Sequence, residues 1–185
     1  MQRPVEIEFA VNLHDDKSGE FYLLQIRPMV DNRMDINEDL TLVPDDDCLL
    51  RSHNAIGNGI ITDITDVVYV KTDAYQPSQN PSIAEEIERI NRSFLATGTS
   101  PDANGDTSVQ AASYLLIGPG RWGSSDPWLG IPVKWPHISA AQVIVEAGLD
   151  NYQVDPSQGT HFFQNLTSLG VCYLTVNAFR QDGIY

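Results

Sequence analysis

The chain has 185 residues, 42% of them hydrophobic, so it can bury a core in one domain, or in one domain and a piece of another. Its formal net charge of −14 at pH 7 opposes binding to nucleic acid and to anionic membranes. No apolar run approaches the roughly 20 residues that span a bilayer, and no signal peptide is visible. Cys48 and Cys172 lie far apart without metal-ligand spacing. We therefore expect a cytoplasmic protein that binds neither nucleic acid nor membrane.

The N-terminal residues predict a β-hairpin. Apolar and polar residues alternate over Val5–Leu13, which is typical of a strand with one apolar and one polar face. A polar turn over His14–Glu20 leads to a second strand over Phe21–Ile26. The first expected element is thus a pair of antiparallel strands at the start of the chain.

The polar face of this hairpin carries a distinctive set of side chains. Glu6 and Glu8 share one face of the first strand, and Gln25 and Arg27 share one face of the second. Two carboxylates, an amide and a guanidinium therefore have the spacing needed to converge. The alternative is an ordinary hairpin with a charged solvent face and a cross-strand Glu–Arg pair.

The hairpin sequence resembles the end of an ATP-grasp nucleotide-binding domain. The residues concerned are Glu6–Phe9 (Glu-Ile-Glu-Phe) and Leu24–Pro28 (Leu-Gln-Ile-Arg-Pro). They are similar to the acidic-x-Glu-aromatic strand and the Gln-x-Arg-Pro strand end of phosphoenolpyruvate synthase and pyruvate phosphate dikinase. Residues 1–30 would then be the last, incomplete hairpin of that domain. The glycine-rich loop and adenine pocket are not in this sequence, so we expect ATP binding to need an upstream ATP-grasp portion of the same protein.

The resemblance implies roles for individual hairpin residues. Glu6 and Glu8 would hold Mg²⁺ and the nucleotide phosphates, whereas Gln25 and Arg27 would contact the phosphates. Carboxylate oxygens suit Mg²⁺, and a guanidinium suits phosphoryl oxygens, so the chemistry is consistent with these roles.

Residues 31–50 predict an acidic linker, and residues 51–185 predict a mixed α/β domain. The Gly/Asn-rich stretch Arg51–Ile60 predicts a turn, followed by strands over Ile60–Ile64 and Val67–Lys71. An apolar stripe predicts an amphipathic helix over Ser82–Leu95, with Ser82 and Glu85 forming a capping box at its start.

A glycine loop follows a predicted buried strand over Tyr114–Ile117 and matches the spacing G-x-G-x-x-G over Gly118–Gly123. A dinucleotide site would need a helix directly afterwards, with Glu146 as the acid that binds the ribose. Proline and glycine residues after the loop argue against that helix. Arg121 then either binds an anion or belongs to a rigid structural loop packed by the tryptophans.

The C-terminal part predicts a strand over Gln142–Glu146, a helix over Phe162–Leu169 that ends at Gly170, and a strand over Val171–Val176. His161 stands at the start of the predicted helix. This order is loosely similar to the swivelling phosphohistidine domain of the same enzyme families.

That second resemblance implies that His161 accepts a phosphoryl group, with the neighbouring Thr160 and Ser157 donating hydrogen bonds to it. A positive helix end would favour the anion. The alternative is a structural histidine that caps the helix or packs on Phe163.

The expected fold is mixed α/β: a terminal ATP-grasp-type hairpin followed by a compact α/β domain. The expected function is part of an ATP-dependent phosphotransferase, a kinase that resembles phosphoenolpyruvate synthase and uses ATP and Mg²⁺ in the intact protein. The chain alone should have little or no kinase activity, and its phosphoryl acceptor substrate stays open. The alternative is a non-catalytic module that docks on the ATP-grasp domain or on a partner through the Trp-rich loop.

Overall fold

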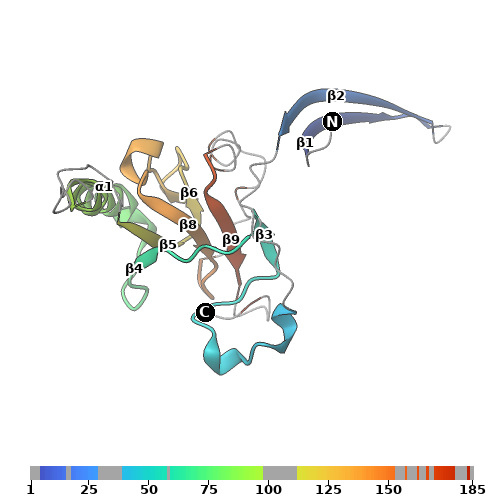
Figure 1. Ribbon diagram of the computed structural model, residues 1–185. Helices are drawn as coiled ribbons and strands as arrows, with labels where there is room; N and C mark the ends of the chain where they lie inside the picture. The colour runs from blue at the N-terminus through green and yellow to red at the C-terminus, as the bar shows by residue number, and fades with distance from the viewer. Residues whose placement is uncertain are drawn as a thin grey trace, which may run out of the picture.

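The computed structural model describes residues 5–15, 18–28, 39–57, 59–97, 112–152, 157, 162, 166, 169–177 and 183. The described chain contains a two-stranded hairpin, a five-stranded mixed sheet and the helix α1 (Figure 1). The expected mixed α/β class is confirmed. In Figure 1 the hairpin extends away from the sheet, and α1 lies along the side of the sheet nearest β4 and β5.

The hairpin consists of β1 (Val5–Leu13) and β2 (Gly19–Pro28), which pair antiparallel. The first strand has the expected bounds, and the second extends further at both ends than the predicted Phe21–Ile26. The turn between the strands is closed by the His14 N–H, which donates to the Ser18 carbonyl at 2.9 Å.

The five-stranded sheet has the order β3-β9-β8-β5-β4. Neighbours among β4, β5, β8 and β9 run parallel, and only β3 pairs antiparallel, with β9. The bounds of these strands are Asn54–Ile56 for β3, Ile64–Tyr69 for β4, Ser113–Pro119 for β5, Ala141–Ala147 for β8 and Cys172–Val176 for β9.

Two predictions in the first part of this domain were wrong. The stretch predicted as a turn over Arg51–Ile60 contains β3, which pairs with the edge of β9 although Asn54 and Ala55 have low strand propensity. The two strands predicted over Ile60–Ile64 and Val67–Lys71 are a single strand, β4. The strand pairs with β5 on both sides of the predicted break between Ile64 and Val67, with a register irregularity between Ile64 and Asp66.

The sheet is buried on both faces because alternate side chains enter different clusters. On one face, Tyr114, Leu116 and Ile144 pack with α1 and with the segment between β5 and β8. On the other face, Ile117 and Val145 pack beneath apolar residues of the segment that precedes β4. The β5 strand is accordingly buried along its whole length.

Helix α1 spans Asn80–Thr97, which is longer than the predicted Ser82–Leu95. The predicted capping box at Ser82 was wrong, because the Ser82 hydroxyl donates to the Gln79 carbonyl at 2.8 Å. A short 3₁₀ turn, η3 (Pro77–Gln79), precedes the helix, and its capping box is formed by Gln76 and Gln79. The helix therefore starts inside a turn that begins earlier than the sequence pattern indicated.

Short elements complete the described structure: η1 (Leu40–Leu42), η2 (Asp45–Asp47), β6 (Arg121–Trp122), β7 (Gly130–Ile131) and η4 (Trp135–His137). The paired strands β6 and β7 occupy the stretch where a dinucleotide fold would place a helix, so the prediction against that helix is confirmed. None of the described helices combines the length and the apolar character that crossing a membrane requires.

Candidate functional site

The polar face of the hairpin brings the predicted nucleotide ligands opposite one another. In the β1–β2 register, Glu6 pairs with Arg27 and Glu8 pairs with Gln25. Directly opposed positions of an antiparallel pair share one face, so the register agrees with the expected convergence, which for the side chains stays a prediction. The side chains of Glu8 and Gln25 are exposed, and those of Glu6 and Arg27 lie outside the described part.

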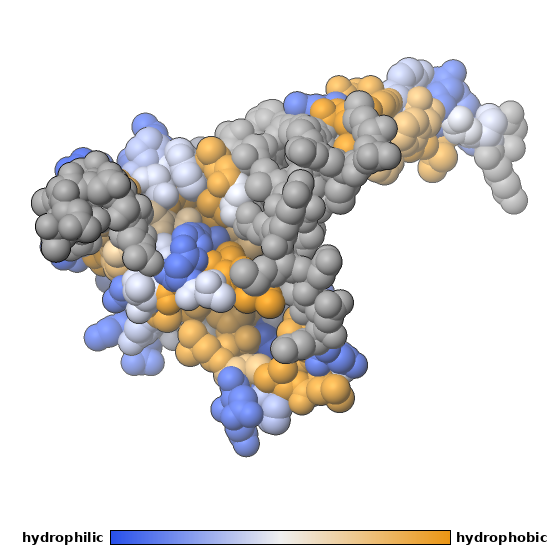
Figure 2. Space-filling model, viewed as in Figure 1, coloured by the Kyte–Doolittle hydropathy of each residue, from blue (hydrophilic) through white to orange (hydrophobic). Residues whose placement is uncertain are grey.

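The opposite face of the hairpin is apolar and equally exposed. Phe9 and Phe21 stack with ring centroids 5.1 Å apart, and their exposed fractions are 53% and 58%. A register shift between Glu8 and Phe9 leaves Leu24 as an extra residue on the second strand. Figure 2 shows apolar residues gathered along this element. The hairpin therefore presents a polar face and an apolar face, neither covered by described residues.

Metal ligation by the hairpin stays a prediction. Among the side chains that the structure describes, no three His, Cys, Asp or Glu residues gather closely enough to hold a metal ion. The proposed pair contributes only Glu8 to that set, because the side chain of Glu6 is not described. Further ligands would have to come from elsewhere, as the resemblance to an ATP-grasp domain implies.

The glycine loop after β5 is filled by the rings of the chain itself. A Cβ added at Gly118 would lie 2.4 Å from the Trp122 ring. One added at Gly120 would lie 2.6 Å from the Tyr152 ring, and one added at Gly123 would lie 2.4 Å from the Phe162 ring. Two of these glycines also have positive φ, +70° and +74°. The glycines are thus required for internal aromatic packing.

Arg121 lies in this loop between the glycines, and its backbone forms the start of β6. Its N–H donates to the Leu129 carbonyl at 3.0 Å, and the residue is half-buried. The residue also takes part in at least one further interaction within the chain. An anion-binding role for Arg121 stays a prediction, and the structure adds a clear structural role for its backbone.

The tryptophans near the loop were predicted to pack together if the loop is structural, but the three do not form one packed group. Trp122 is buried in the main core, where its Nε1–H donates to the Val145 carbonyl at 2.9 Å. Trp135 packs against the same core, whereas Trp128 is 67% exposed. The loop is therefore anchored by Trp122 and presents Trp128 to solvent.

A buried carboxylate links this loop to the rest of the sheet. Glu146 is 5% exposed and stands near the end of β8, opposite Gly118 of β5. The backbone N–H groups of Trp122 and Ser157 each donate to it at 3.0 Å. The hydroxyls of Ser157 and Tyr173 also donate to it. Both carboxylate oxygens are thus satisfied by internal donors, which compensates the cost of burying the charge.

The titration of Tyr173 reflects this environment. Burial raises the pKa of its hydroxyl well above the ordinary value, and the charge of Glu146 adds to the effect. The hydroxyl therefore remains a proton donor to Glu146. We interpret the cluster of Glu146, Ser157, Tyr173 and Trp122 as a structural joint between β8, β9 and the glycine loop.

A second polar cluster lies where the β4–α1 connection meets the glycine loop. Asn80 is fully buried; its amide donates to the Pro127 carbonyl at 2.6 Å and accepts from the Tyr75 hydroxyl at 2.9 Å. Tyr152 packs edge-on against Tyr75, with centroids 5.4 Å apart. The buried Tyr152 hydroxyl has no hydrogen bond within the described part of the chain, and burial raises its pKa.

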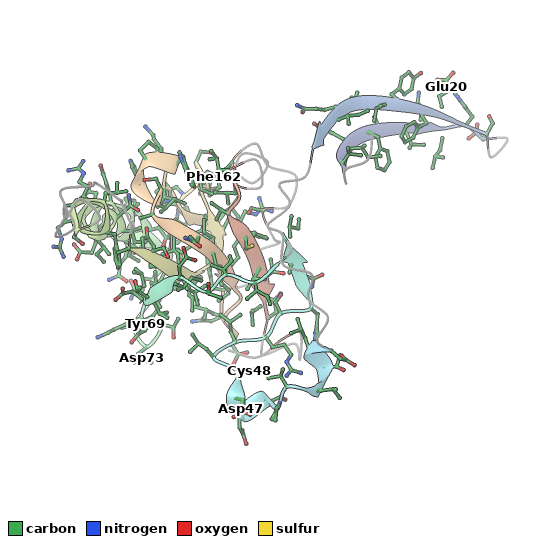
Figure 3. The ribbon with its side chains drawn as sticks, viewed as in Figure 1. Glu20, Asp47, Cys48, Tyr69, Asp73 and Phe162 are labelled. Carbon is green, nitrogen blue, oxygen red and sulfur yellow. The ribbon has the colours of Figure 1, made fainter. Side chains whose placement is uncertain are left out.

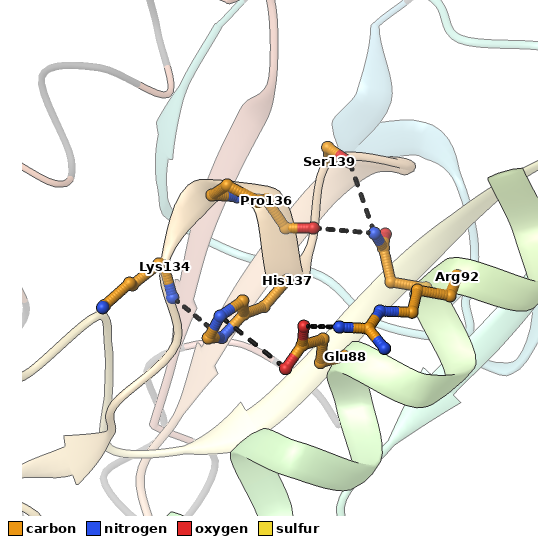
Figure 4. A network of polar contacts seen from close by, with 7 residues as sticks. Glu88, Arg92, Lys134, Pro136, His137 and Ser139 are labelled. Atoms are coloured by element: carbon orange, nitrogen blue, oxygen red, sulfur yellow. Dashed lines mark hydrogen bonds and ion pairs between the residues drawn. The ribbon is translucent and has the colours of Figure 1, made fainter.

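Helix α1 is fixed to the segment before β8 by a third network (Figure 4). The buried Asn91 amide donates to the Pro136 carbonyl at 3.1 Å, and its oxygen accepts from the Tyr114 hydroxyl at 2.9 Å. Closer to solvent, Glu88 pairs with Arg92 and lies 3.8 Å from His137. This network positions the helix against the core.

His161, the predicted phosphoryl acceptor, lies outside the described residues, as does Thr160. The residue that follows it, Phe162, is described and lies against Gly123. Leu166 is buried and its carbonyl accepts the Val171 N–H at 3.0 Å, and Gly170 has the positive φ of +76° expected at a helix end.

A groove of about 430 Å³ lies beside β4, between the strand and α1. Its walls include Val68 and Val70 from the β4 side and Ile83, Ile87 and Ile90 from the helix. The sequence pattern indicated an apolar helix stripe but gave no sign that part of it would face a groove.

Comparison of the chain with protein-family models, with curated proteins and with solved structures found no match. The features that sequence reasoning missed are the joint at Glu146 and the Asn80 cluster. For Glu146 the sequence signal is an acidic residue at the end of an apolar run, whereas Asn80 lies in a polar stretch that gives no such signal.

Proposed function

We propose that the chain is part of an ATP-dependent phosphotransferase resembling phosphoenolpyruvate synthase, to which the hairpin contributes ligands for Mg²⁺ and nucleotide phosphates. The hairpin register carries this proposal, because it sets Glu6 opposite Arg27 and Glu8 opposite Gln25 on one polar face. Carboxylates suit Mg²⁺, and a guanidinium suits the phosphates that the metal accompanies.

The apolar face of the hairpin supports the presence of an upstream partner portion. Ile7 is 45% exposed and Leu23 is 48% exposed, although they belong to a continuous apolar face. Two-stranded hairpins are marginal in water unless their apolar face is covered. An upstream ATP-grasp portion of the same protein would cover this face and leave the polar face toward bound nucleotide. The chain alone then has little or no kinase activity.

His161 is the proposed phosphoryl acceptor. Its imidazole nitrogen would form the P–N bond while the P–O bond to the departing nucleotide breaks. The supporting observation is that the next residue, Phe162, contacts Gly123 in the loop that carries Arg121. A guanidinium near a transferred phosphoryl group would neutralise part of its charge.

The test uses the protein in which this chain follows its ATP-grasp portion, incubated with Mg²⁺ and γ-labelled ATP. We expect acid-labile, base-stable label on the protein. His161→Ala should abolish it, and Glu8→Gln should lower it by about tenfold or more, since metal sites are sensitive to the loss of one carboxylate. Glu20→Gln is the matched control, because Glu20 is an exposed hairpin glutamate outside the motif.

Undiminished labelling of the His161→Ala protein would refute the phosphohistidine step. Equal labelling of the Glu8→Gln and Glu20→Gln proteins would refute the ligand role of the hairpin. The two results are independent, so the acceptor and the nucleotide site are tested separately.

A second candidate function is a non-catalytic docking module. The observation that favours it is the 67% exposed side chain of Trp128 on the loop anchored by the buried Trp122. Large exposed aromatic residues on rigid loops are common contact points in interfaces. Retention of full labelling activity together with loss of a stable partner complex in Trp128→Ala would support this role.

A further inference from the structure

Strand β4 forms an open edge of the five-stranded sheet. It stands last in the strand order, and no described strand pairs with its outer side. The Val70 N–H just after the strand donates to the Ile117 carbonyl of β5 at 3.0 Å. Because backbone groups alternate sides along a strand, those of Val67 and Tyr69 point to the outer side. These groups are a template for one more strand.

The groove beside this edge has apolar walls that could receive apolar side chains of such a strand. Val68 and Val70 pack toward the main core, and Ile83, which also lines the groove, packs against the same core. Helix α1 makes its main contacts with η4 and β7, so it leaves a gap of about 430 Å³ on the β4 side. Every second side chain of an added strand would enter this apolar gap.

The other face of the edge is exposed and partly apolar. Val67 is 44% exposed and Tyr69 is 56% exposed. Figure 3 shows Tyr69 and Asp73 together at the end of β4. The remaining side chains of an added strand would lie beside Val67 and Tyr69, near solvent.

The charge around the edge defines what kind of strand fits. Asp63, Asp66 and Asp73 border the strand and its connection to α1, against a single cation in that stretch, Lys71. The whole chain carries a net charge of −14. A cationic partner is therefore attracted both locally and at long range.

We propose that the outer edge of β4 is a docking site for an extended segment of a partner protein in which apolar and basic residues alternate. The segment adds a strand to the sheet, places its apolar side chains in the groove beside Ile83, and directs its basic side chains toward the acidic border. A second copy of this chain is a poor occupant, because its own hairpin offers Glu8 and Glu20 on the polar face and would repel the acidic border.

The experiment probes the chain with a short synthetic peptide in which lysine and valine alternate. Hydrogen exchange of the amides is followed by NMR. On binding, exchange at Val67 and Tyr69 should slow by about tenfold or more, since both amides gain a partner. The Val70 amide is an internal reference, because it is already bonded to Ile117.

Two controls separate strand addition from general attraction to an acidic protein. The same peptide with N-methyl groups on its pairing amides keeps its charge and side chains but cannot pair, so it should not protect Val67 or Tyr69. Asp73→Lys should weaken binding by about threefold or more, whereas Asp47→Lys, the same charge change on η2, should have a smaller effect.

Three results would overturn the proposal. One is the absence of protection at Val67 and Tyr69 at saturating peptide. Another is equal binding of the N-methylated peptide. The third is protection of both amides without peptide that grows with protein concentration, which would assign the edge to a second copy of the chain.

Discussion

The hairpin and the five-stranded sheet are both built from strands rich in apolar residues, yet their side chains differ sharply in exposure. In β1, Ile7 and Phe9 alternate with glutamates and are 45% and 53% exposed. In β8, Ile144 is fully buried, and even its neighbour Glu146 is 5% exposed. Alternation in β1 and a nearly continuous apolar run in β8 each predict a strand, but the burial of the side chains depends on which segments pack on the two faces. The hairpin therefore has an apolar face that no described residue covers, whereas both faces of the sheet are covered by other segments of the chain.

The difference has an energetic meaning. Burying apolar side chains is the main favourable term in folding, so the stability of this chain resides in the sheet and its covering segments. The hairpin contributes little until another surface covers it. Substitutions that are matched between the two regions can test this division.

The largest difference is expected for an isoleucine-to-alanine pair. Ile144→Ala should lower the free energy of unfolding by about 2–5 kcal/mol, because the side chain is fully buried in the main core. Ile7→Ala should change it by no more than about 0.5 kcal/mol in the isolated chain, because the side chain is largely exposed. Urea denaturation followed by tryptophan fluorescence gives both values. Similar losses for the two variants would show that the hairpin is already packed.

A pair of glycine substitutions should give the next largest difference. Gly118→Ala would place a methyl group 2.4 Å from the Trp122 ring, so we expect a loss of about 1–3 kcal/mol. Gly19→Ala meets its nearest atom at 3.4 Å and should be nearly neutral. Thermal unfolding of both variants provides the measurement. A neutral Gly118→Ala would mean that the glycine loop can move away from β5.

Alkaline pH should weaken the sheet domain through its buried tyrosines. Burial raises the pKa of Tyr114 and of Tyr173, so both stay protonated in the native state after the unfolded chain has lost those protons. The unfolded state then binds fewer protons, and stability falls as pH rises above about 10, by about 1.4 kcal/mol per pH unit for each tyrosine. Below that pH these groups should leave stability unchanged.

Denaturant midpoints measured between about pH 8 and about pH 11 would test this slope. Tyr114→Phe should make the fall of stability with pH less steep by the contribution of one tyrosine, about 1.4 kcal/mol per pH unit. A level profile across this range would contradict the burial of both hydroxyl groups.

The smallest effect is expected where the sheet domain meets solvent. In the network of Figure 4, Glu88 pairs with Arg92, whose side chain is 73% exposed. Glu88→Gln should therefore cost less than about 1 kcal/mol and should lose that effect at high salt. Asn91→Ala, one turn away and fully buried, should cost more, because it leaves the Ala140 N–H and the Tyr114 hydroxyl without their acceptor. Equal costs would mean that the surface pair fixes the helix.

Local pattern was sufficient to predict β1, β5, β8 and α1 nearly at their observed positions. Strict alternation, an unbroken apolar run and a helical stripe each leave few alternatives. The same reasoning missed β3, because Asn54 and Ala55 have low strand propensity and are recruited by the edge of β9. It also split β4, where Asp66 interrupts the apolar residues but not the pairing with β5.

The candidate site was predictable only in part. The hairpin register agrees with the convergence expected for Glu8 and Gln25, since the face on which each residue lies follows from the two-residue period of its strand. The joint at Glu146 was not foreseen, because its donors come from segments far apart in the sequence. The groove depends on how far α1 lies from β4, which no local pattern specifies.

The strand order of the sheet has a consequence for where ligands reach this fold. The strands β4, β5, β8 and β9 follow one another across the sheet in the order of the sequence. The strand order does not reverse among these described parallel strands, so they contain no topological switch point. In open α/β sheets, ligand crevices form where neighbouring connections diverge at such a point. Here the described apolar residues of the connections that follow β4, β5 and β8 pack in one cluster, on one face of the sheet. At the carboxyl end of β5 the glycine loop is filled by the chain's own rings, whereas the groove beside β4 and both faces of the hairpin lie open to contact in the described part of the chain.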